Sequence, residues 1–256
     1  MNQQANNVVL VTGGSRGIGR GIVEAFLQSG ATVYACGRSA PETPLVAGDR
    51  KARFVEADVR DPDHIDELVT TIEHEAGGLN TLINNAGGSP SAEAATASPR
   101  FTEAIVRLNL LAPLWVSQRA YAPLKARHGS IVNIASVSAV RASPGTVAYG
   151  AAKAGLLSAT RSLAQEWGPD VRVNAIIAGL IRTEAARDHY NGDAGIAALE
   201  RRLPGRRLGE PSDIAGACLY LASPAAGYVS GAALEVSGGG EPPSFLGFVE
   251  EAQRAD

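Results

Sequence analysis

Short apolar runs rich in valine and isoleucine alternate along this chain with longer stretches whose apolar residues recur at helical spacing. Apolar runs without a polar face are typical of strands that are buried on both sides. Because helical stretches separate them, the pattern favours a parallel sheet covered by helices on both faces. The predicted strands are Val8–Thr12, Thr32–Cys36, Arg53–Val59, Leu79–Asn84, Ser130–Ala135, Arg172–Ala178 and Ala233–Val236. We therefore predict a doubly wound α/β sheet of about seven strands, with ligand chemistry at the carboxyl ends of the strands.

Two segments lack this alternation. The region 183–204 has no strong period and lies between the last two predicted strands, and the tail 241–256 follows three consecutive glycines. Neither segment resembles a domain of its own. We predict a single domain over residues 1–256, since α/β domains of this size commonly stay undivided.

Composition and charge narrow the class of protein. The 256 residues carry a net charge of −3, so we expect no partner that is a nucleic acid or an anionic membrane surface. No apolar run approaches the roughly 18 residues that a membrane span needs, and the N-terminus lacks a signal-peptide pattern, which predicts a soluble, cytoplasmic protein. Cys36 and Cys218 fall in apolar patterns and are expected to be buried.

Two short basic groups stand near the end of the chain, at Arg201–Arg202 and Arg206–Arg207. We interpret them as solvated loop surface that the neighbouring Glu200 and Glu210 partly neutralise.

A glycine-rich stretch follows the first predicted strand directly and leads into a helix. Glycines permit a tight turn and a close approach of the backbone to a pyrophosphate, whose charge the helix N-terminus stabilises. This succession of strand, loop and helix predicts nucleotide binding. The candidate residues in the loop are Gly13, Ser15, Arg16, Gly17, Ile18 and Gly19.

The end of the second predicted strand bears on which nucleotide is bound. A fold specific for NAD places an acidic residue there, where it accepts a hydrogen bond from the ribose 2′-hydroxyl. This chain has Gly37 and Arg38 instead, and Arg38 offers a bidentate donor for a 2′-phosphate, with Arg16 as a second positive charge. We predict NADP(H) over NAD(H); the alternative is that both arginines are ordinary surface residues.

Candidate chemistry lies further along the chain, where Tyr149 and Lys153 share one helix face because they are four residues apart. A lysine ammonium favours the phenolate of a nearby tyrosine and lowers its pKa. Ser136 ends the predicted strand Ser130–Ala135, where its hydroxyl can donate to a substrate carbonyl. Tyrosine and lysine at this spacing are by themselves common on helix surfaces, so the prediction depends on the other motifs.

Asn109 adds a feature of the backbone. The stretch Thr102–Tyr121 has a helical pattern, yet Pro113 falls inside it. Since proline has no N–H, the carbonyl of Asn109 loses its partner and the helix should kink there. A freed carbonyl can hold a water, and a kink without any chemistry is the equal alternative.

Together these residues resemble the short-chain dehydrogenase/reductase family in its compact, single-domain form, which has a Rossmann-type sheet. The match covers Val8 to about Gly239. The motifs that carry it are Thr12–Gly19, Asp58-Val59, Asn84-Asn85-Ala86-Gly87, Asn109, Ser136, Tyr149 with Lys153, and Asn174, Gly179 and Thr183.

The resemblance implies roles for these residues. Tyr149 would be the general acid in reduction and the base in oxidation, Lys153 would lower its pKa and bind the nicotinamide ribose, and Ser136 would orient the carbonyl. Asn109 would anchor the water of a proton relay through Lys153. The residues implied to contact the cofactor are Asp58, Val59, Asn85, Ala86, Gly87, Tyr149, Lys153, Gly179, Ile181 and Thr183, besides those of the glycine loop and Arg38.

Two positions depart from the family pattern. Ala178 stands where a proline is usual, so the loop beside the nicotinamide loses a fixed φ, and Ser237 stands where an aspartate is common. Enoyl reductases of the superfamily space their tyrosine and lysine more widely, which leaves hydride transfer to a ketone or from a secondary alcohol.

Several alternatives stay open. A 3-oxoacyl-thioester reductase is the commonest assignment, a reductase or dehydrogenase of a small cyclic or aliphatic compound is the second, and a catalytically silent NADP-binding protein is the third. An acidic carrier protein would need a basic rim, which the arginines at 201–207 could supply. The segment 183–204 is expected to form a substrate lid, and a homotetramer is implied. The apolar Phe245, Leu246 and Phe248 suggest that the tail docks, with fraying as the alternative.

Overall fold

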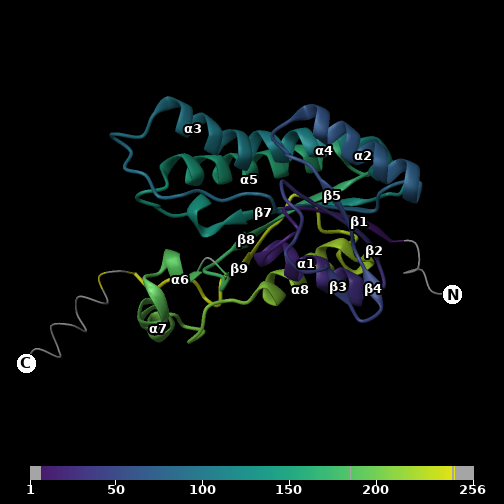
Figure 1. The fold of residues 1–256 in the computed structure, drawn as a ribbon. Coiled ribbons are helices and arrows are strands. Elements are labelled where there is room, and N and C mark those ends of the chain that lie inside the picture. Colours follow the sequence, from purple (N-terminus) through teal and green to yellow (C-terminus); the bar gives the residue numbers. More distant parts are fainter. Residues whose placement is uncertain (1–6, 185, 244, 246–256) are drawn as a thin grey trace, which may run out of the picture.

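The computed structural model describes residues 7–184, 186–243 and 245 of the chain, and its centre is one parallel sheet (Figure 1). The strand order is β5-β2-β1-β6-β7-β8-β9, and every neighbouring pair is parallel. These strands are β1 (Val8–Thr12), β2 (Thr32–Gly37), β5 (Arg53–Glu56), β6 (Thr81–Asn84), β7 (Ser130–Ser136), β8 (Arg172–Ala178) and β9 (Ala233–Val236). The predicted doubly wound α/β fold is confirmed.

Helices cover both faces of the sheet (Figure 1). Side chains of β1 alternate between two apolar cores: Val9 and Val11 pack on one side, and Val8 and Leu10 on the other. The first core contains residues of α1 (Gly17–Gln28) and α8 (Pro211–Ala222), and the second contains residues of α2 (Pro62–Ala76), α4 (Ala112–Lys125) and α5 (Val147–Trp167). Because both faces of each strand are buried, the strands carry the continuous apolar runs seen in the sequence.

Strand ends differ from the predicted ones by up to three residues. The run predicted to end at Val59 ends at Glu56, because the chain turns at Asp58, whose carboxylate accepts the backbone N–H of Arg60 at 3.0 Å. The strand β6 begins at Thr81, after Asn80 has used its side chain to accept the N–H of Val8. A short hairpin of β3 (Val46–Ala47) and β4 (Arg50–Lys51) was not predicted.

The stretch predicted as one kinked helix has three parts. The helix α3 (Pro99–Val106) passes into a π-helical turn over Arg107–Leu111, and α4 follows. Pro113 lies in the first turn of α4, where a missing N–H disturbs no helical bond within α4. The predicted interruption is real, and a π turn around Asn109 absorbs it.

The segment 183–204, which has no strong period, contains two helices, α6 (Ala186–His189) and α7 (Gly192–Arg202). They lie at the carboxyl edge of the sheet, apart from the layered body (Figure 1). Both cysteines are buried and free, as predicted. In the described part of the chain, no helix combines the length and apolar character needed to cross a membrane.

Candidate active site

The glycine-rich loop after β1 is packed closely against the loop after β6. Gly13 has φ of +64°, and a Cβ there would lie 2.9 Å from the Cα of Ala86. At Gly19 a Cβ would lie 2.1 Å from the carbonyl oxygen of Gly13. Both positions therefore exclude any larger residue, which leaves the backbone of the loop exposed to a ligand that approaches from outside. This cradle fits the pyrophosphate of a dinucleotide.

Polar contacts fix the two loops to each other. The hydroxyl oxygen of Thr12 accepts the backbone N–H groups of Asn85 and Ala86, each at 3.0 Å. In return, the side-chain amide of Asn85 donates to the carbonyl oxygens of Thr12 at 2.9 Å and Gly13 at 3.0 Å. Asn85, predicted to line the cofactor, thus also shapes the glycine loop.

We predict that Thr12→Val destabilises the protein by about 2 kcal/mol, because two N–H groups lose their acceptor in a place closed to water. Thr12→Ser is the matched control, since it keeps the hydroxyl. Urea denaturation of both variants measures the difference; equal stability of the valine and serine variants would contradict the role of the hydroxyl.

The N-terminus of α1 faces the segment that follows β8. Arg16 precedes the helix in an extended conformation, and α1 has neither a side-chain cap nor an acidic residue in its first turn. Instead, the N–H of Gly17 donates to the carboxylate Oε1 of Glu184 at 3.2 Å. A Cβ at Gly17 would lie 3.3 Å from Cγ2 of Thr183, so the predicted cofactor residue Thr183 also lies against this helix end. The sequence analysis missed Glu184, whose only signal is its place after Thr183.

The other predicted nucleotide residues lie at the ends of β2 and β5. Arg38 is exposed, as is Arg16. The side-chain hydrogen bond from Arg60 holds the pKa of the Asp58 carboxyl below its usual value, and the charge of Arg38 adds to this effect. Val59 is buried beside Asp58. The Arg38 guanidinium is therefore near the pair implied to bind adenine.

Tyr149, Lys153 and Ser136 converge at the carboxyl end of β7. Burial raises the pKa of Tyr149, and the nearby Ser136 hydroxyl lowers it by less. Lys153 Nζ lies 5.7 Å from the centre of the Tyr149 ring and donates to the carbonyl oxygen of Ile134 at 2.8 Å. Burial lowers the pKa of Lys153 to about 8. The pKa of Tyr149 is thus raised by burial and not lowered as expected from the nearby Lys153.

Asn109 reaches the same place from the π turn. Its side chain is fully buried, accepts the N–H of Gly88, and donates to the carbonyl oxygens of Gly88 and Ile105, all at 2.9 Å. A Cβ on Gly87 would lie 2.8 Å from Oδ1 of Asn109 and 3.1 Å from Nζ of Lys153. Both side chains therefore lie against Gly87, and the four predicted catalytic side chains are brought to one region of the protein.

The loop after β8 is close to the end of β9. Gly179 donates its N–H to Val236 at 3.0 Å, and a Cβ there would lie 2.7 Å from the Cα of Ser237. Only glycine fits, so this residue is fixed by packing as well as by its predicted place beside the cofactor. Ile181 is buried against the residues that lead into α8. Ala178, where the family has proline, is buried as the last residue of β8.

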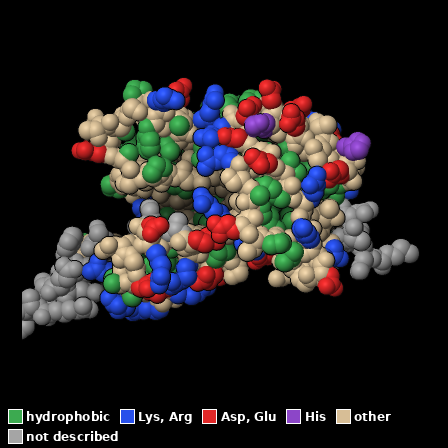
Figure 2. Space-filling model, viewed as in Figure 1, with side chains coloured by type: hydrophobic (Ala, Val, Ile, Leu, Met, Phe, Trp, Pro, Cys, Tyr) green, Lys and Arg blue, Asp and Glu red, His purple; other side chains and the backbone are tan. Residues whose placement is uncertain are grey.

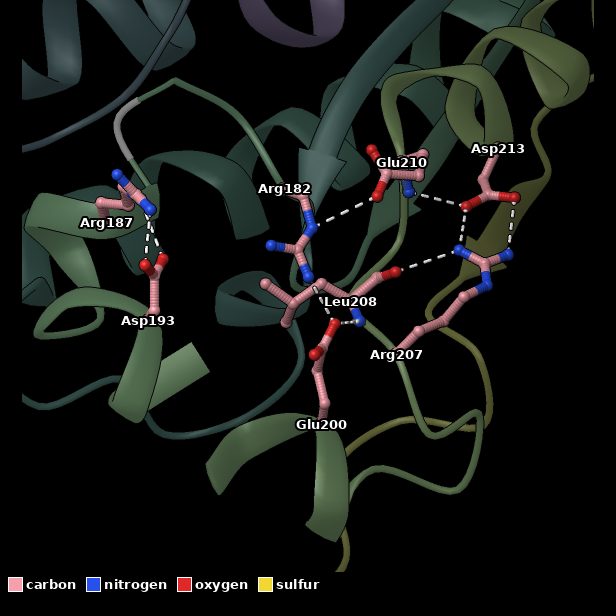
Figure 3. A network of polar contacts seen from close by, with 8 residues as sticks. All are labelled: Arg182, Arg187, Asp193, Glu200, Arg207, Leu208, Glu210 and Asp213. Carbon is pink, nitrogen blue, oxygen red and sulfur yellow. Dashed lines mark hydrogen bonds and ion pairs between the residues drawn. The ribbon is translucent and has the colours of Figure 1, made fainter. Parts of the chain in front are cut away.

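Ion pairs fasten the segment 183–204 to the body of the protein (Figure 3). Arg182 pairs with Glu200 of α7 at 2.6 Å and with Glu210 at 3.3 Å, and Glu200 also accepts the N–H of Leu208. Arg207 is paired with Asp213 at 2.6 Å. The prediction that Glu200 and Glu210 partly neutralise the neighbouring arginines is incomplete, because both acids also pair with Arg182. The charge of Glu210 still contributes to the raised pKa of Arg207.

A cavity of about 850 Å³ lies between the end of β7, the segment 203–209 and the residues after β9. Figure 2 shows the molecule hollowed between the α3–α5 side and the α6–α7 segment. The walls of the 850 Å³ cavity include Val137, Val140 and Leu203. Across it, Arg141 pairs with Glu241 at 2.7 Å, which brings the first residue of the tail near the loop that follows Ser136. This contact gave no signal in the sequence.

No group of three metal-ligating side chains exists among the described residues. Of the predicted tail residues, Phe245 is 62% exposed. Leu246 and Phe248 lie outside the described residues.

Known proteins resemble the whole described arrangement. A family profile described as enoyl-(acyl carrier protein) reductase matches residues 13–241. An uncharacterized oxidoreductase of Mycobacterium tuberculosis is 38% identical, with 91% of this chain and 92% of that protein covered. A 3-oxoacyl-(acyl-carrier-protein) reductase of Vibrio harveyi is 34% identical, over 91% of this chain and 96% of that one.

The solved structure of an aldohexose dehydrogenase from Thermoplasma acidophilum, in ligand-free form, has a TM-score of 0.86 and 31% identity, and the match covers 92% of this chain and 94% of that one. Sequence and fold agree over the same nine-tenths of the chain. This protein is therefore an oxidoreductase of the short-chain dehydrogenase/reductase family.

Proposed function

We propose that the protein is an NADP(H)-dependent oxidoreductase that interconverts a ketone and a secondary alcohol. The observation that carries this proposal is the convergence of Tyr149, Ser136, Lys153 and Asn109 beside the loops that fit a dinucleotide. The nicotinamide ring would supply or accept the hydride. The work of the chain is to hold the two reactants, and to deliver or remove the proton.

Tyr149 is the proposed proton donor in reduction. Its burial raises its pKa, which keeps the phenol protonated at neutral pH and ready to donate to a carbonyl oxygen. The nearby Ser136 hydroxyl would donate to the same oxygen and direct it toward Tyr149. In the alcohol-oxidising direction Tyr149 takes the proton, and a protonated Lys153 near its ring stabilises the phenolate.

The proton path is proposed to run from Tyr149 to Lys153 and on toward Asn109. With its pKa near 8, Lys153 can release and regain a proton close to neutral pH. Asn109, held rigidly by Gly88 and Ile105, would offer its backbone carbonyl to a water. Gly87 lets the Lys153 and Asn109 side chains approach the cofactor ribose from one side.

The proposed cofactor contacts follow the same edge of the sheet. Asp58 and Val59 would meet the adenine, the glycine loop the pyrophosphate, and Ala86 and Gly87 the ribose side. Gly179, Ile181 and Thr183 would meet the carboxamide and phosphate. Arg38, with Arg16, would bind the 2′-phosphate that distinguishes NADP(H) from NAD(H).

We expect Arg38→Asp to lower the preference for NADPH over NADH by about 100-fold in kcat/KM, because it removes a charge-assisted donor and adds a repelling carboxylate. Arg161→Asp, on the exposed surface of α5, is the matched control. Steady-state rates with both cofactors measure the ratio. An unchanged ratio would mean that Arg38 does not bind the 2′-phosphate.

The substrate is proposed only as a class. The cavity has apolar walls beside a paired charge, which suits a partly apolar carbonyl compound. A 3-oxoacyl thioester remains one candidate, and a small cyclic or aliphatic compound the other. Arg207 is paired with Asp213, which leaves less of a basic rim for an acidic carrier protein than the sequence suggested.

A panel of ketones and 3-oxoacyl thioesters, assayed by NADPH consumption, tests the proposed function. Turnover of one class identifies the substrate type. Tight NADPH binding without turnover of any carbonyl compound would favour the catalytically silent alternative. The homotetramer, the cytoplasmic location and the lid role of residues 183–204 stay predictions.

A further inference from the structure

The Glu184 carboxylate lies at the N-terminus of α1, the position at which the pyrophosphate of a bound dinucleotide is expected. Its Oε1 accepts the N–H of Gly17 at 3.2 Å, at the first residue of α1. Its Oε2 would lie 3.5 Å from a Cβ on Gly17. Residues 17 and 184 are 167 positions apart, so the contact is made by the tertiary fold and not by a local cap.

The helix end that Glu184 contacts has no other anion. No side chain caps α1, and its first turn contains no acidic residue. A helix N-terminus favours negative charge through its unpaired N–H groups and its dipole. In a dinucleotide-binding loop that negative charge is the pyrophosphate. Glu184 and the pyrophosphate therefore require the same donor, and two anions that approach one donor repel each other.

We propose that Glu184 is an internal competitor for the cofactor pyrophosphate and so sets the affinity of the protein for its dinucleotide. The inference rests on the proposed function only in that a dinucleotide binds. It holds for NADP(H) and NAD(H) alike, because both contain the pyrophosphate. Binding requires the Glu184 carboxylate to leave Gly17.

The same contact connects the cofactor loop to the start of the segment 183–204. On one side of Glu184, Arg182 is fixed by Glu200 and Glu210. On the other side, α6 begins at Ala186, whose N–H donates to the carbonyl oxygen of Thr183. Since Arg182 is anchored, we expect any backbone movement that accompanies displacement of the Glu184 side chain on the α6 side of Glu184. Cofactor binding is thus expected to alter the first turn of this segment.

The test compares affinities of two ligands for three proteins. Glu184→Gln removes the charge and keeps the shape of the side chain, and Asp188→Asn removes one exposed charge from α6 as the matched control. NADP⁺ contains the pyrophosphate, and adenosine 2′-monophosphate does not. We expect Glu184→Gln to bind NADP⁺ about ten-fold more tightly by calorimetry, because one competing negative charge is removed, and to bind adenosine 2′-monophosphate with unchanged affinity.

A second readout is structural. Hydrogen exchange of the α6 amides should become faster in the wild-type protein when NADP⁺ is added, and Glu184→Gln should show the faster exchange without nucleotide. Equal or weaker NADP⁺ binding by Glu184→Gln would overturn the inference, as would the same gain in Asp188→Asn or with adenosine 2′-monophosphate. If wild-type protein binds neither NADP⁺ nor NAD⁺, the proposed function itself fails.

Discussion

Tyr149→Phe is expected to lower kcat by about 1000-fold while the affinity for NADPH stays close to that of the wild-type protein. The change removes only the hydroxyl that lies near Ser136, so the reacting carbonyl loses its proton donor while the cofactor loops are untouched. Single-turnover rates with NADPH and an accepted carbonyl compound measure the chemical step, and a fluorescence titration measures cofactor binding.

Tyr228→Phe is the matched control, because this tyrosine is fully exposed and removal of its hydroxyl should leave kcat unchanged. Tyr149→Phe could instead retain more than about a tenth of the wild-type kcat. That loss would be smaller than the contribution that general acid catalysis normally makes to the rate. The proton would then have to come from another group, and Tyr149 would not have the proposed role.

Lys153→Met should have two separable consequences. The first is a loss of kcat of about 100-fold or more, since the phenolate of Tyr149 loses its nearby cation and the proton path is cut. The second concerns stability, because burial lowers the pKa of Lys153 from 10.5 to about 8. Removal of a lysine with only a structural role could also lower the activity. The pH dependence of the free energy of unfolding is therefore the more specific measurement of Lys153.

The sign of that dependence follows from proton linkage. Between about pH 8 and 10.5 the unfolded chain keeps the Lys153 proton and the folded protein loses it. The free energy of unfolding of the wild-type protein should therefore rise with pH across this window, relative to Lys153→Met, by about 3 kcal/mol. Below pH 8 both states bind the proton, and the full cost of burying the charge applies.

Urea denaturation of wild type and Lys153→Met at both ends of this pH window measures the difference in their free energies of unfolding. The titration of all groups that the two proteins share cancels in this difference. Lys51→Met, at an exposed position, controls for the loss of a lysine in general. If the stability difference between wild type and Lys153→Met did not change with pH, Lys153 would not be buried as a weakly protonated amine.

Much of the fold could be predicted from the amino-acid sequence alone. Runs such as Val8–Thr12 and Arg172–Ala178 are apolar on both faces, and only a strand in a covered parallel sheet meets that requirement, so their bounds were predicted correctly. Spacing of four residues placed Tyr149 and Lys153 on one face of a helix, and the parallel sheet brought Ser136 to them. These features are local, or they follow from the common direction of the strands.

Element ends were less predictable because single contacts decide them. The strand β5 stops where Asp58 accepts the N–H of Arg60, a bond that the apolar pattern of Arg53–Val59 does not reveal. Pro113 correctly predicted an interruption of the helix, but the π turn and the use of the Asn109 side chain to hold Gly88 depend on packing. A pattern of apolar residues indicates which positions are buried, but it does not indicate which polar groups form hydrogen bonds with each other.

Residue types and their spacing alone thus established the sheet, the family and the predicted catalytic side chains. Only the tertiary structure decided the contacts between distant segments: Glu184 on Gly17, 167 positions away, and Arg141 with Glu241, 100 positions away. It also brought Glu200 and Glu210 to Arg182, which lies outside the two arginine groups that the sequence placed beside them. The physical reason is that a surface charge pairs with whatever opposite charge the packing of the chain brings near. That partner can be a close neighbour, as for Arg187 and Asp193, or a residue 100 positions away.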